Sequence, residues 1–154
     1  MKKYTLLFLI IPFVFSCSNS DFNNTNPFVP NYTFAIDLNM NLPEYSDLKF
    51  VSNAVYVPGI GARGVIVFNT GSGYNAFDAA CPNQAISACS TMAINGIYAV
   101  CGCDNKEYNL FTGQSDLQYP MKQYRVQVNG TTLRVYNWIK KSSVLRHWIS
   151  KLTD

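Results

Sequence analysis

The sequence predicts an all-β domain between residues 34 and 137. Three observations support this fold class. Short apolar stretches of strand length alternate with turn residues through this part of the chain. Residues 81–113 show little helical periodicity and are rich in Cys, Gly and Asn, as expected of loops held by cross-links or a metal. Residues 124–136 contain two alternating segments joined at Asn129-Gly130, a pair typical of a type I′ hairpin turn.

Further strands are expected before the cysteine-rich region. Each is a short segment in which β-branched and aromatic side chains prevail. The expected strands cover residues 34–37, 48–51, 54–57, 64–68 and 74–78. A Thr-Gly-Ser-Gly turn joins the last two of them into a hairpin.

Residues 1–16 have the layout of a secretory signal peptide. Lys2 and Lys3 precede an apolar run over residues 6–15, which is shorter than the about 20 residues needed to span a bilayer. The run ends in Val-Phe-Ser-Cys17, which resembles the lipobox of bacterial lipoproteins. This resemblance implies lipid attachment to Cys17 and anchoring to a membrane of the bacterial cell envelope, facing the periplasm or the cell surface. A plain signal peptide with an incidental cysteine is the alternative.

Residues 17–33 are expected to form a lipidated tether. They are rich in Asn, contain two prolines and carry almost no charge, a composition that buries little surface. The rest of the chain suits one domain, residues 34–137, with one core. The formal net charge is +3, and loss of Lys2 and Lys3 with the signal peptide leaves +1. Because no basic patch with interleaved aromatic residues occurs in the domain, nucleic-acid binding is excluded.

Residues 138–154 predict a basic amphipathic helix at the C-terminus. Such a helix packs on the sheet or on a partner, and the alternative is that it rests on an anionic membrane surface. His147 is the single histidine of the chain, and it is expected to be solvated rather than a ligand. The apolar positions that recur at helical spacing are Trp138, Leu145, Trp148, Ile149 and Leu152.

The domain contains four cysteines, Cys81, Cys89, Cys101 and Cys103, and three of them lie in two short motifs. Cys81-Pro-Asn83 is followed, after seventeen residues, by Cys101-Gly-Cys103-Asp104. This frame resembles the motif of Rieske-type ferredoxins, in which C-x-H and C-x-x-H hold a [2Fe–2S] cluster through two Cys and two His.

The segments around the frame extend the resemblance to residues 46–137. A strand pair leads into the first loop, a Thr112-Gly113 turn follows the second, and the segment from Tyr119 resembles the family's return to the base sheet. The resemblance implies a Rieske-like fold, with antiparallel base sheets and a subdomain made of two cluster-binding-type loops.

Residue by residue, the resemblance assigns Cys81 and Cys101 to the two thiolate positions. It assigns Asn83 and Asp104 to the two imidazole positions. A neutral carboxamide is a poor iron ligand, and a carboxylate is a hard donor that differs from imidazole in charge and geometry. No cofactor is therefore expected, and a [2Fe–2S] cluster held through substitute ligands is the alternative.

The resemblance also implies two disulfides. In the high-potential Rieske proteins of respiratory complexes, two extra cysteines clasp the cluster loops together, and Cys89 and Cys103 lie in the matching loops. The family's two thiolates bind one iron, so Cys81 and Cys101 are expected to lie close enough to form a second bridge where the metal is lost. Such bridges persist outside the cytoplasm. With Cys17 lipidated, they account for all five cysteines.

These observations predict a cell-envelope lipoprotein whose degenerate Rieske-like domain is a binding or scaffold module for an unidentified protein partner. The alternative is a Rieske-type electron-transfer protein with substitute ligands. Two further interpretations stay open: a thiol–disulfide switch at an exposed Cys81–Cys101 pair, and structural zinc bound by the four cysteines, whose spacings fit zinc knuckles poorly. No base is placed to activate a nucleophile and no acidic pair stands out, so an enzyme is not predicted.

Overall fold

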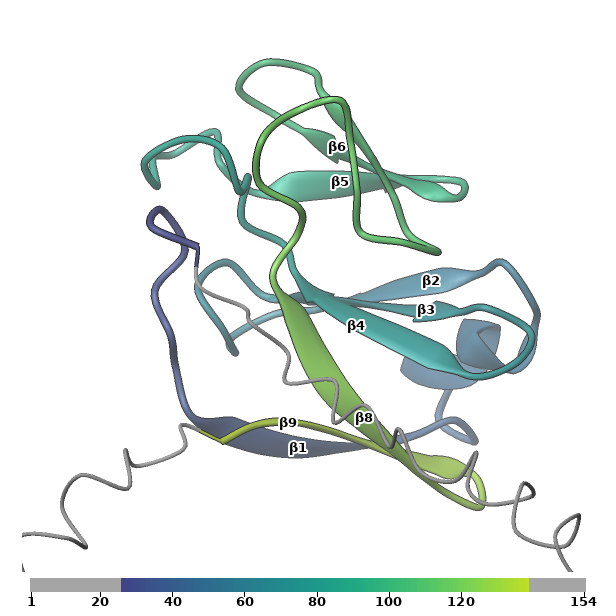
Figure 1. Ribbon diagram of the computed structural model, residues 1–154. Helices are drawn as coiled ribbons and strands as arrows, with labels where there is room; N and C mark the ends of the chain where they lie inside the picture. The colour runs from purple at the N-terminus through teal and green to yellow at the C-terminus, as the bar shows by residue number, and fades with distance from the viewer. Residues whose placement is uncertain (1–25, 139–154) are drawn as a thin grey trace, which may run out of the picture.

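The computed structural model describes residues 26–138, which form nine strands and one short 3-10 helix (Figure 1). The predicted signal peptide, the lipidation site Cys17 and the predicted C-terminal helix from residue 139 on, with His147, lie outside the described residues. The all-β prediction is confirmed, and every strand pair in the described part of the chain is antiparallel. The elements are β1 (Phe34–Asn39), η1 (Pro43–Lys49), β2 (Ala54–Val57), β3 (Val65–Asn69), β4 (Tyr74–Asp78), β5 (Met92–Asn95), β6 (Tyr98–Cys101), β7 (Glu107–Asn109), β8 (Gln123–Asn129) and β9 (Thr132–Asn137).

The larger sheet has six strands in the order β1-β9-β8-β4-β3-β2. Strand β8 serves both halves of this sheet. Its first residues pair with β4, where Tyr124 lies opposite Ala76, and residues 125–129 pair with β9. Figure 1 shows β8 running from the layer of β2, β3 and β4 to the ribbon of β1 and β9, so the sheet curls around this strand.

Strand β3 is buried along its whole length because both of its faces are covered. Successive side chains of a strand point to opposite faces. Ile66 and Phe68 therefore enter one apolar core, which includes residues of the cysteine loops. Val65 and Val67 enter a second core, formed against β1 and β9. Two cores on either side of one strand fix the position of the cysteine loops relative to the base sheet.

A second, three-stranded sheet in the order β5-β6-β7 carries the second cysteine loop. The sequence prediction of loops through residues 81–113 was wrong here, because three short strands lie in this range. Asn95 and Tyr98 are partners across a two-residue turn of Gly96 and Ile97. Asn-Gly between apolar runs is a hairpin signal, and it was present in the sequence.

Residues 48–51 do not form the expected strand. Leu48 is fully buried at the end of the 3-10 helix η1, which begins at Pro43, a residue whose fixed φ suits a first helical position. The two residues after the helix, Phe50 and Val51, are 63 % and 61 % exposed. One apolar residue of the run enters the core and the others do not, so the alternation expected of a strand is absent.

The β8–β9 hairpin is present, but its turn differs from the expected type I′. The turn residues are Gly130 and Thr131, and Asn129 pairs with Thr132 as the last residue of the ladder. Gly130 has φ +61°, whereas neither Asn129 nor Thr131 has a positive φ. A positive φ at the first turn residue alone belongs to type II′.

The described end of the predicted tether is docked on the domain. Residues 26–33 were expected to bury little, yet Val29 is 2 % exposed. The ammonium group of Lys122 donates hydrogen bonds to the carbonyl oxygens of Val29 (3.2 Å) and Pro30 (3.0 Å). The composition of residues 26–33 predicted a free segment because the contacts that hold it involve backbone carbonyl groups, which amino-acid composition does not reveal.

Candidate functional site

The first cysteine loop, residues 79–91, begins at a buried carboxylate. Asp78 is the last residue of β4, and its side chain accepts hydrogen bonds from the N–H groups of Ala80 (2.8 Å) and Ala62 (2.6 Å) and from the Tyr124 hydroxyl (2.6 Å). Burial, reinforced by the Asp78 charge, raises the pKa of Tyr124 far above its ordinary value, so the phenol stays protonated and donates. This network fixes the exit of the loop from the sheet.

The second cysteine loop, residues 102–106, is a tight turn between β6 and β7. The N–H of Cys101 donates to the carbonyl of Lys106 (2.9 Å), and the N–H of Asn105 donates to the carbonyl of Cys101 (3.0 Å). Asn105 has φ +57°, a left-handed conformation that asparagine tolerates better than most residues. The turn presents Cys103 toward the first loop.

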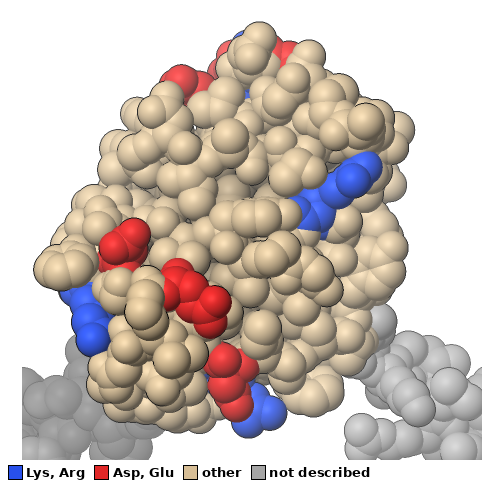
Figure 2. Space-filling view, turned by 180° about the vertical axis from the view of Figure 1, so that it is seen from behind, with Lys and Arg blue, Asp and Glu red and all other residues tan. Residues whose placement is uncertain are grey.

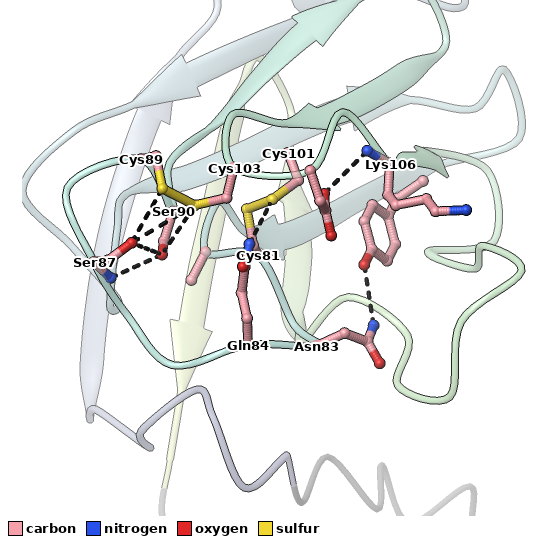
Figure 3. Close-up of a disulfide and its surroundings, with 12 residues drawn as sticks. Cys81, Asn83, Gln84, Ser87, Cys89, Ser90, Cys101, Cys103 and Lys106 are labelled. Atoms are coloured by element: carbon pink, nitrogen blue, oxygen red, sulfur yellow. Dashed lines mark hydrogen bonds between the residues drawn. A yellow bond between two sulfur atoms is a disulfide. The ribbon is translucent and has the colours of Figure 1, made fainter.

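Two disulfides join the loops side by side (Figure 3). They are Cys81–Cys101, with Cα atoms 5.5 Å apart, and Cys89–Cys103, with Cα atoms 5.0 Å apart, the pairs that the resemblance implies. Cys81 and Cys101 are buried, whereas Cys103 is half-buried and Cys89 is exposed. The interpretation of Cys81–Cys101 as an exposed switch was therefore wrong, because the bridge that faces solvent is Cys89–Cys103.

Gly102 allows the loops to approach each other. A β-carbon at this position would lie 2.7 Å from the carbonyl oxygen of Cys89 and 3.5 Å from that of Thr91. Cβ atoms do not come as close to a backbone oxygen as the first of these distances. Glycine between Cys101 and Cys103 is thus a steric requirement of the clasp.

Asn83, at the first imidazole position, is engaged in hydrogen bonds within the protein. Its Nδ2 donates to the carbonyl of Tyr119 (2.7 Å) and to the hydroxyl of Tyr108 (3.0 Å), and its Oδ1 accepts from the N–H of Tyr119 (2.9 Å). In Figure 3 the Asn83 side chain points away from the sulfur atoms. The amide therefore ties the first loop to residues 114–121 instead of facing the cysteines.

Asp104, at the second imidazole position, is exposed. Its Oδ1 accepts a hydrogen bond from the N–H of Lys106 (3.1 Å), which closes a short turn of the second loop. Among the described residues, one group of ligand-type atoms lies within 4.8 Å of one another, the sulfurs of Cys81, Cys101 and Cys103, and Asp104 is not part of it.

Gln84 faces the sulfur atoms that Asn83 avoids. Its Nε2 donates to the Sγ of Cys101 at 2.9 Å (Figure 3). Nothing in the residue type or the spacing of Gln84 predicted that it would contact a disulfide. The site thus combines two bridges with one amide donor directed at the buried one.

Tyr108 and Tyr119 are contacts of Asn83 that the cysteine frame could not predict. Tyr108 is buried on β7, and burial raises the pKa of its hydroxyl, which keeps the phenol neutral. Asn26 adds a third connection, since its Nδ2 donates to the carbonyl of Pro82 (2.8 Å). The docked segment and the domain together form a groove, which is lined by Asn26, Pro27, Val29, Pro30, Asn31, Tyr119 and Lys122.

The residues present do not fit a [2Fe–2S] cluster of the Rieske type. Such a centre needs two free thiolates and two imidazoles. Here Cys81 and Cys101 are bonded to each other, Asn83 uses its amide in structural hydrogen bonds, and Asp104 lies in a surface turn. The donor set has neither the right chemistry nor the right orientation.

The described part of the chain contains no membrane-spanning helix: between residues 26 and 138, no helix is long and apolar enough to cross a bilayer.

No family model and no curated protein matches the chain. Among solved structures, it is similar to a chain from the complex of reduced oxygenase and oxidized ferredoxin in carbazole 1,9a-dioxygenase, with 18 % identity, TM-score 0.45, and coverage of 68 % of this chain and 92 % of that one. It is also similar to a Sphingomonas yanoikuyae ferredoxin, with 15 % identity, TM-score 0.43, and coverage of 60 % and 94 %.

A third similar structure is described as the small subunit of an NADH-dependent nitrite reductase from Mycobacterium tuberculosis, with 13 % identity, TM-score 0.44, and coverage of 71 % and 99 %. Likeness at these scores carries nothing about activity. In this chain, the two thiolate positions of the expected Rieske-like frame are bridged, and the two imidazole positions hold an amide and a carboxylate.

Proposed function

We propose that this protein is a cell-envelope lipoprotein whose Rieske-like domain holds no iron–sulfur cluster and serves as a binding or scaffold module. The observation that carries the proposal is the use of the ligand positions as structural bonds. Cys81 and Cys101 form a buried disulfide, and Asn83 exchanges hydrogen bonds with Tyr119. Each of these bonds would have to break before a cluster could form.

The loop end of the domain is rigid enough to serve as a preformed binding surface. Two disulfides connect the cysteine loops, and Asn83 connects the first loop to residues 114–121. A preorganised surface binds with a smaller entropy cost than a mobile one. In the proposed function, the disulfides and the Asn83 amide supply this rigidity in place of a cluster.

The surface chemistry favours a protein partner over a polyanion. Figure 2 shows a face on which uncharged side chains prevail and acidic and basic groups are scattered. Recognition of nucleic acid requires a concentration of positive charge. Contacts through uncharged polar and aromatic groups suit a protein partner instead.

The lipid anchor rests on the sequence around Cys17, and fractionation of the full chain tests it. The expected result is that the wild type sediments with membranes and that Cys17→Ala does not. A Cys17→Ala variant that stays with the membrane fraction would contradict the anchor.

An electron carrier with substitute ligands is the second candidate. The observation that favours it is the approach of the sulfurs of Cys81, Cys101 and Cys103 to within 4.8 Å of one another, since thiolates at such distances can share a metal. The candidate requires that the bridges be open when the cluster is inserted.

The deciding experiment is a measurement of iron, acid-labile sulfide and disulfide content on the full chain, purified from membranes without oxygen. We expect two disulfides per chain and no visible absorption from sulfur-to-iron charge transfer. Two irons and two sulfides per chain with that absorption would overturn the proposal and establish the electron carrier.

A further inference from the structure

We propose that the two disulfides form an exchange pair in which the outer bridge gives access to the inner one. When an external thiol opens Cys89–Cys103, the freed thiolate of Cys103 attacks Cys81 and displaces Cys101. This activity goes beyond a scaffold role, and it rests on the cluster-free domain proposed above.

The accessibility of the sulfur atoms sets the order of events. Cys81 is 1 % exposed and Cys101 is 0 % exposed, so an external thiol cannot reach the inner bridge in the folded protein. Cys89 is exposed and is the sulfur that such a thiol meets first. Thiol–disulfide exchange depends on access and on which sulfur is attacked.

The position of Cys103 makes the second step possible. Its Sγ lies within 4.8 Å of the sulfurs of both Cys81 and Cys101, whereas Cys89 does not belong to this group. Figure 3 shows the two bridges side by side, with the Cys103 end of the outer bridge nearer to the inner bridge than the Cys89 end. Attack on Cys81 is preferred over attack on Cys101, because a bridge between Cys101 and Cys103 would strain the short loop that contains both.

Hydrogen-bond donors stand beside the sulfurs of the outer bridge. The hydroxyl of Ser87 lies 3.2 Å from the Sγ of Cys89 and 3.6 Å from that of Cys103, and the hydroxyl of Ser90 lies 3.8 Å from the latter. The guanidinium of Arg63 donates to the Ser87 carbonyl, so a positive charge lies beside the loop that carries Cys89. Donors and nearby cations stabilise a thiolate and so assist its departure.

The inner leaving group has its own donor. The amide of Gln84 donates to the Sγ of Cys101 at 2.9 Å, and it does not contact Cys81 or Cys103 in this way. A thiolate at Cys101 would thus accept a hydrogen bond that a thiolate at Cys81 would lack. This asymmetry selects Cys101 as the sulfur released.

The electrons balance in both steps. First, a thiolate of a small thiol bonds to Cys89, the Cys89–Cys103 bond breaks, and its electron pair leaves on Cys103. Second, Cys103 bonds to Cys81, the Cys81–Cys101 bond breaks, and its electron pair leaves on Cys101, which water can protonate. The number of disulfides is unchanged, and the external thiol is the reagent that starts the sequence.

Two single variants of the full chain test the second step. Cys89→Ser leaves Cys103 permanently free beside the inner bridge, and Cys103→Ser leaves Cys89 free on the far side. Both lose the same disulfide, so they are matched in stability. Each is incubated at neutral pH, quenched in acid to stop exchange, unfolded, alkylated in mild acid and mapped by mass spectrometry.

We expect Cys89→Ser to carry its label on both Cys103 and Cys101, with at least about tenfold more label on Cys101 than in Cys103→Ser. We expect Cys103→Ser to be labelled at Cys89. Adding Gln84→Leu to Cys89→Ser should lower the share of label on Cys101, since the departing thiolate loses its donor. Label confined to Cys103 in Cys89→Ser would overturn the proposal.

If the variants unfold, the labelling pattern will differ from the expected one, because random disulfide exchange in an unfolded chain would also label Cys81. In that case the wild type decides: a limiting amount of a small thiol should yield an adduct on Cys89 and a free thiol at Cys101. A free thiol at Cys103 alone would refute the exchange. Finding iron in place of bridges would overturn the proposed function as well, whereas two fixed bridges would overturn the exchange alone.

Discussion

Asn83 and Tyr119 exchange two hydrogen bonds across 36 positions of sequence, with the amide oxygen accepting from the Tyr119 N–H at 2.9 Å and the amide nitrogen donating to the Tyr119 carbonyl at 2.7 Å. A carboxamide can do this because it has a donor and an acceptor side by side. An imidazole cannot satisfy both backbone groups in this way. The residue that departs from the Rieske pattern is therefore suited to a structural role.

Replacing Asn83 should destabilise the protein far more than replacing Asp104. Asn83→Ala leaves partly buried backbone groups of Tyr119 unpaired, and we expect a loss of about 2–3 kcal/mol in the free energy of unfolding. Asp104→Ala removes an exposed turn contact, and we expect a change within about 0.5 kcal/mol. Urea denaturation of both variants measures the difference, and equal losses would contradict the structural role of Asn83.

Placing histidine at positions 83 and 104 should not create a cluster site. Asn83→His with Asp104→His still leaves Cys81 bridged to Cys101, and it breaks the connection to Tyr119. We expect lower stability and no iron bound after anaerobic reconstitution. Stoichiometric iron with a Rieske-type spectrum would show that the loops retain the geometry of a cluster site.

Gly102→Ala should weaken the clasp between the loops. The new β-carbon would meet the carbonyl oxygen of Cys89 at 2.7 Å, so the loops must separate, at a cost of about 1–3 kcal/mol. Gly73→Ala is the matched control, because no atom lies within 4 Å of a β-carbon there and φ is not positive. Thermal unfolding should distinguish the two, and a Gly102→Ala protein as stable as Gly73→Ala would refute the steric argument.

Tyr124→Phe should be costly because it removes a hydrogen bond to a buried carboxylate. The hydroxyl of Tyr124 donates to Asp78 at 2.6 Å, and a bond to a charged group is worth about 1.5–3 kcal/mol. Tyr56→Phe removes a hydrogen bond from a partly exposed tyrosine to the carbonyl of Arg63 and should cost less than about 1 kcal/mol. Chemical denaturation compares them, and a Tyr124→Phe loss no larger than that of Tyr56→Phe would contradict the network.

Stability should depend on pH through Lys122. Burial lowers the pKa of this ammonium group below its ordinary value of 10.5, so between the lowered pKa and 10.5 the unfolded chain binds more protons than the folded one. Stability from this group therefore rises with pH in that window. The difference in unfolding free energy between Lys122→Met and the wild type should shift in favour of the wild type as pH approaches 10.5.

Lys106→Met is the control for this pH dependence. The hydrogen bond and charge of Asp116 raise the pKa of Lys106, so its contribution is present up to 10.5 and is lost above that value. The difference between Lys106→Met and the wild type should stay flat over the window in which Lys122 changes. Parallel behaviour of the two variants would exclude Lys122 as the titrating group.

The sequence predicted the base sheet well because its strands are short runs of β-branched and aromatic residues and its turns carry Gly and Asn. It failed at residues 48–51, where a single buried Leu48 in a 3-10 helix resembles the start of a strand. It also missed β5 and β6, since Cys-rich composition masked the hairpin signal at Asn95-Gly96. The local sequence pattern determines whether a segment forms a strand only where tertiary packing does not favour another structure.

The site was predictable in its cysteines and less so in its supporting residues. The pairs Cys81–Cys101 and Cys89–Cys103 followed from the resemblance to Rieske proteins, and the structure contains both bridges. The roles of Asn83 and Gln84 depend instead on side-chain direction, since these neighbours in sequence contact different groups. Nothing in residue type or spacing distinguishes an amide that binds a backbone from one that binds a sulfur.

Because the chain is docked on the domain from Asn26 onward, only residues 18–25 would separate the domain from a lipid anchor at Cys17. With lipid on Cys17, residues 18–25 and their flanking bonds could extend to about 30 Å at most. Because Asn26 is hydrogen-bonded to Pro82, the first cysteine loop would stay within roughly this distance of the lipid attachment. A partner embedded in the same bilayer would then meet this loop at a high effective concentration, so that even a weak contact could be fully occupied.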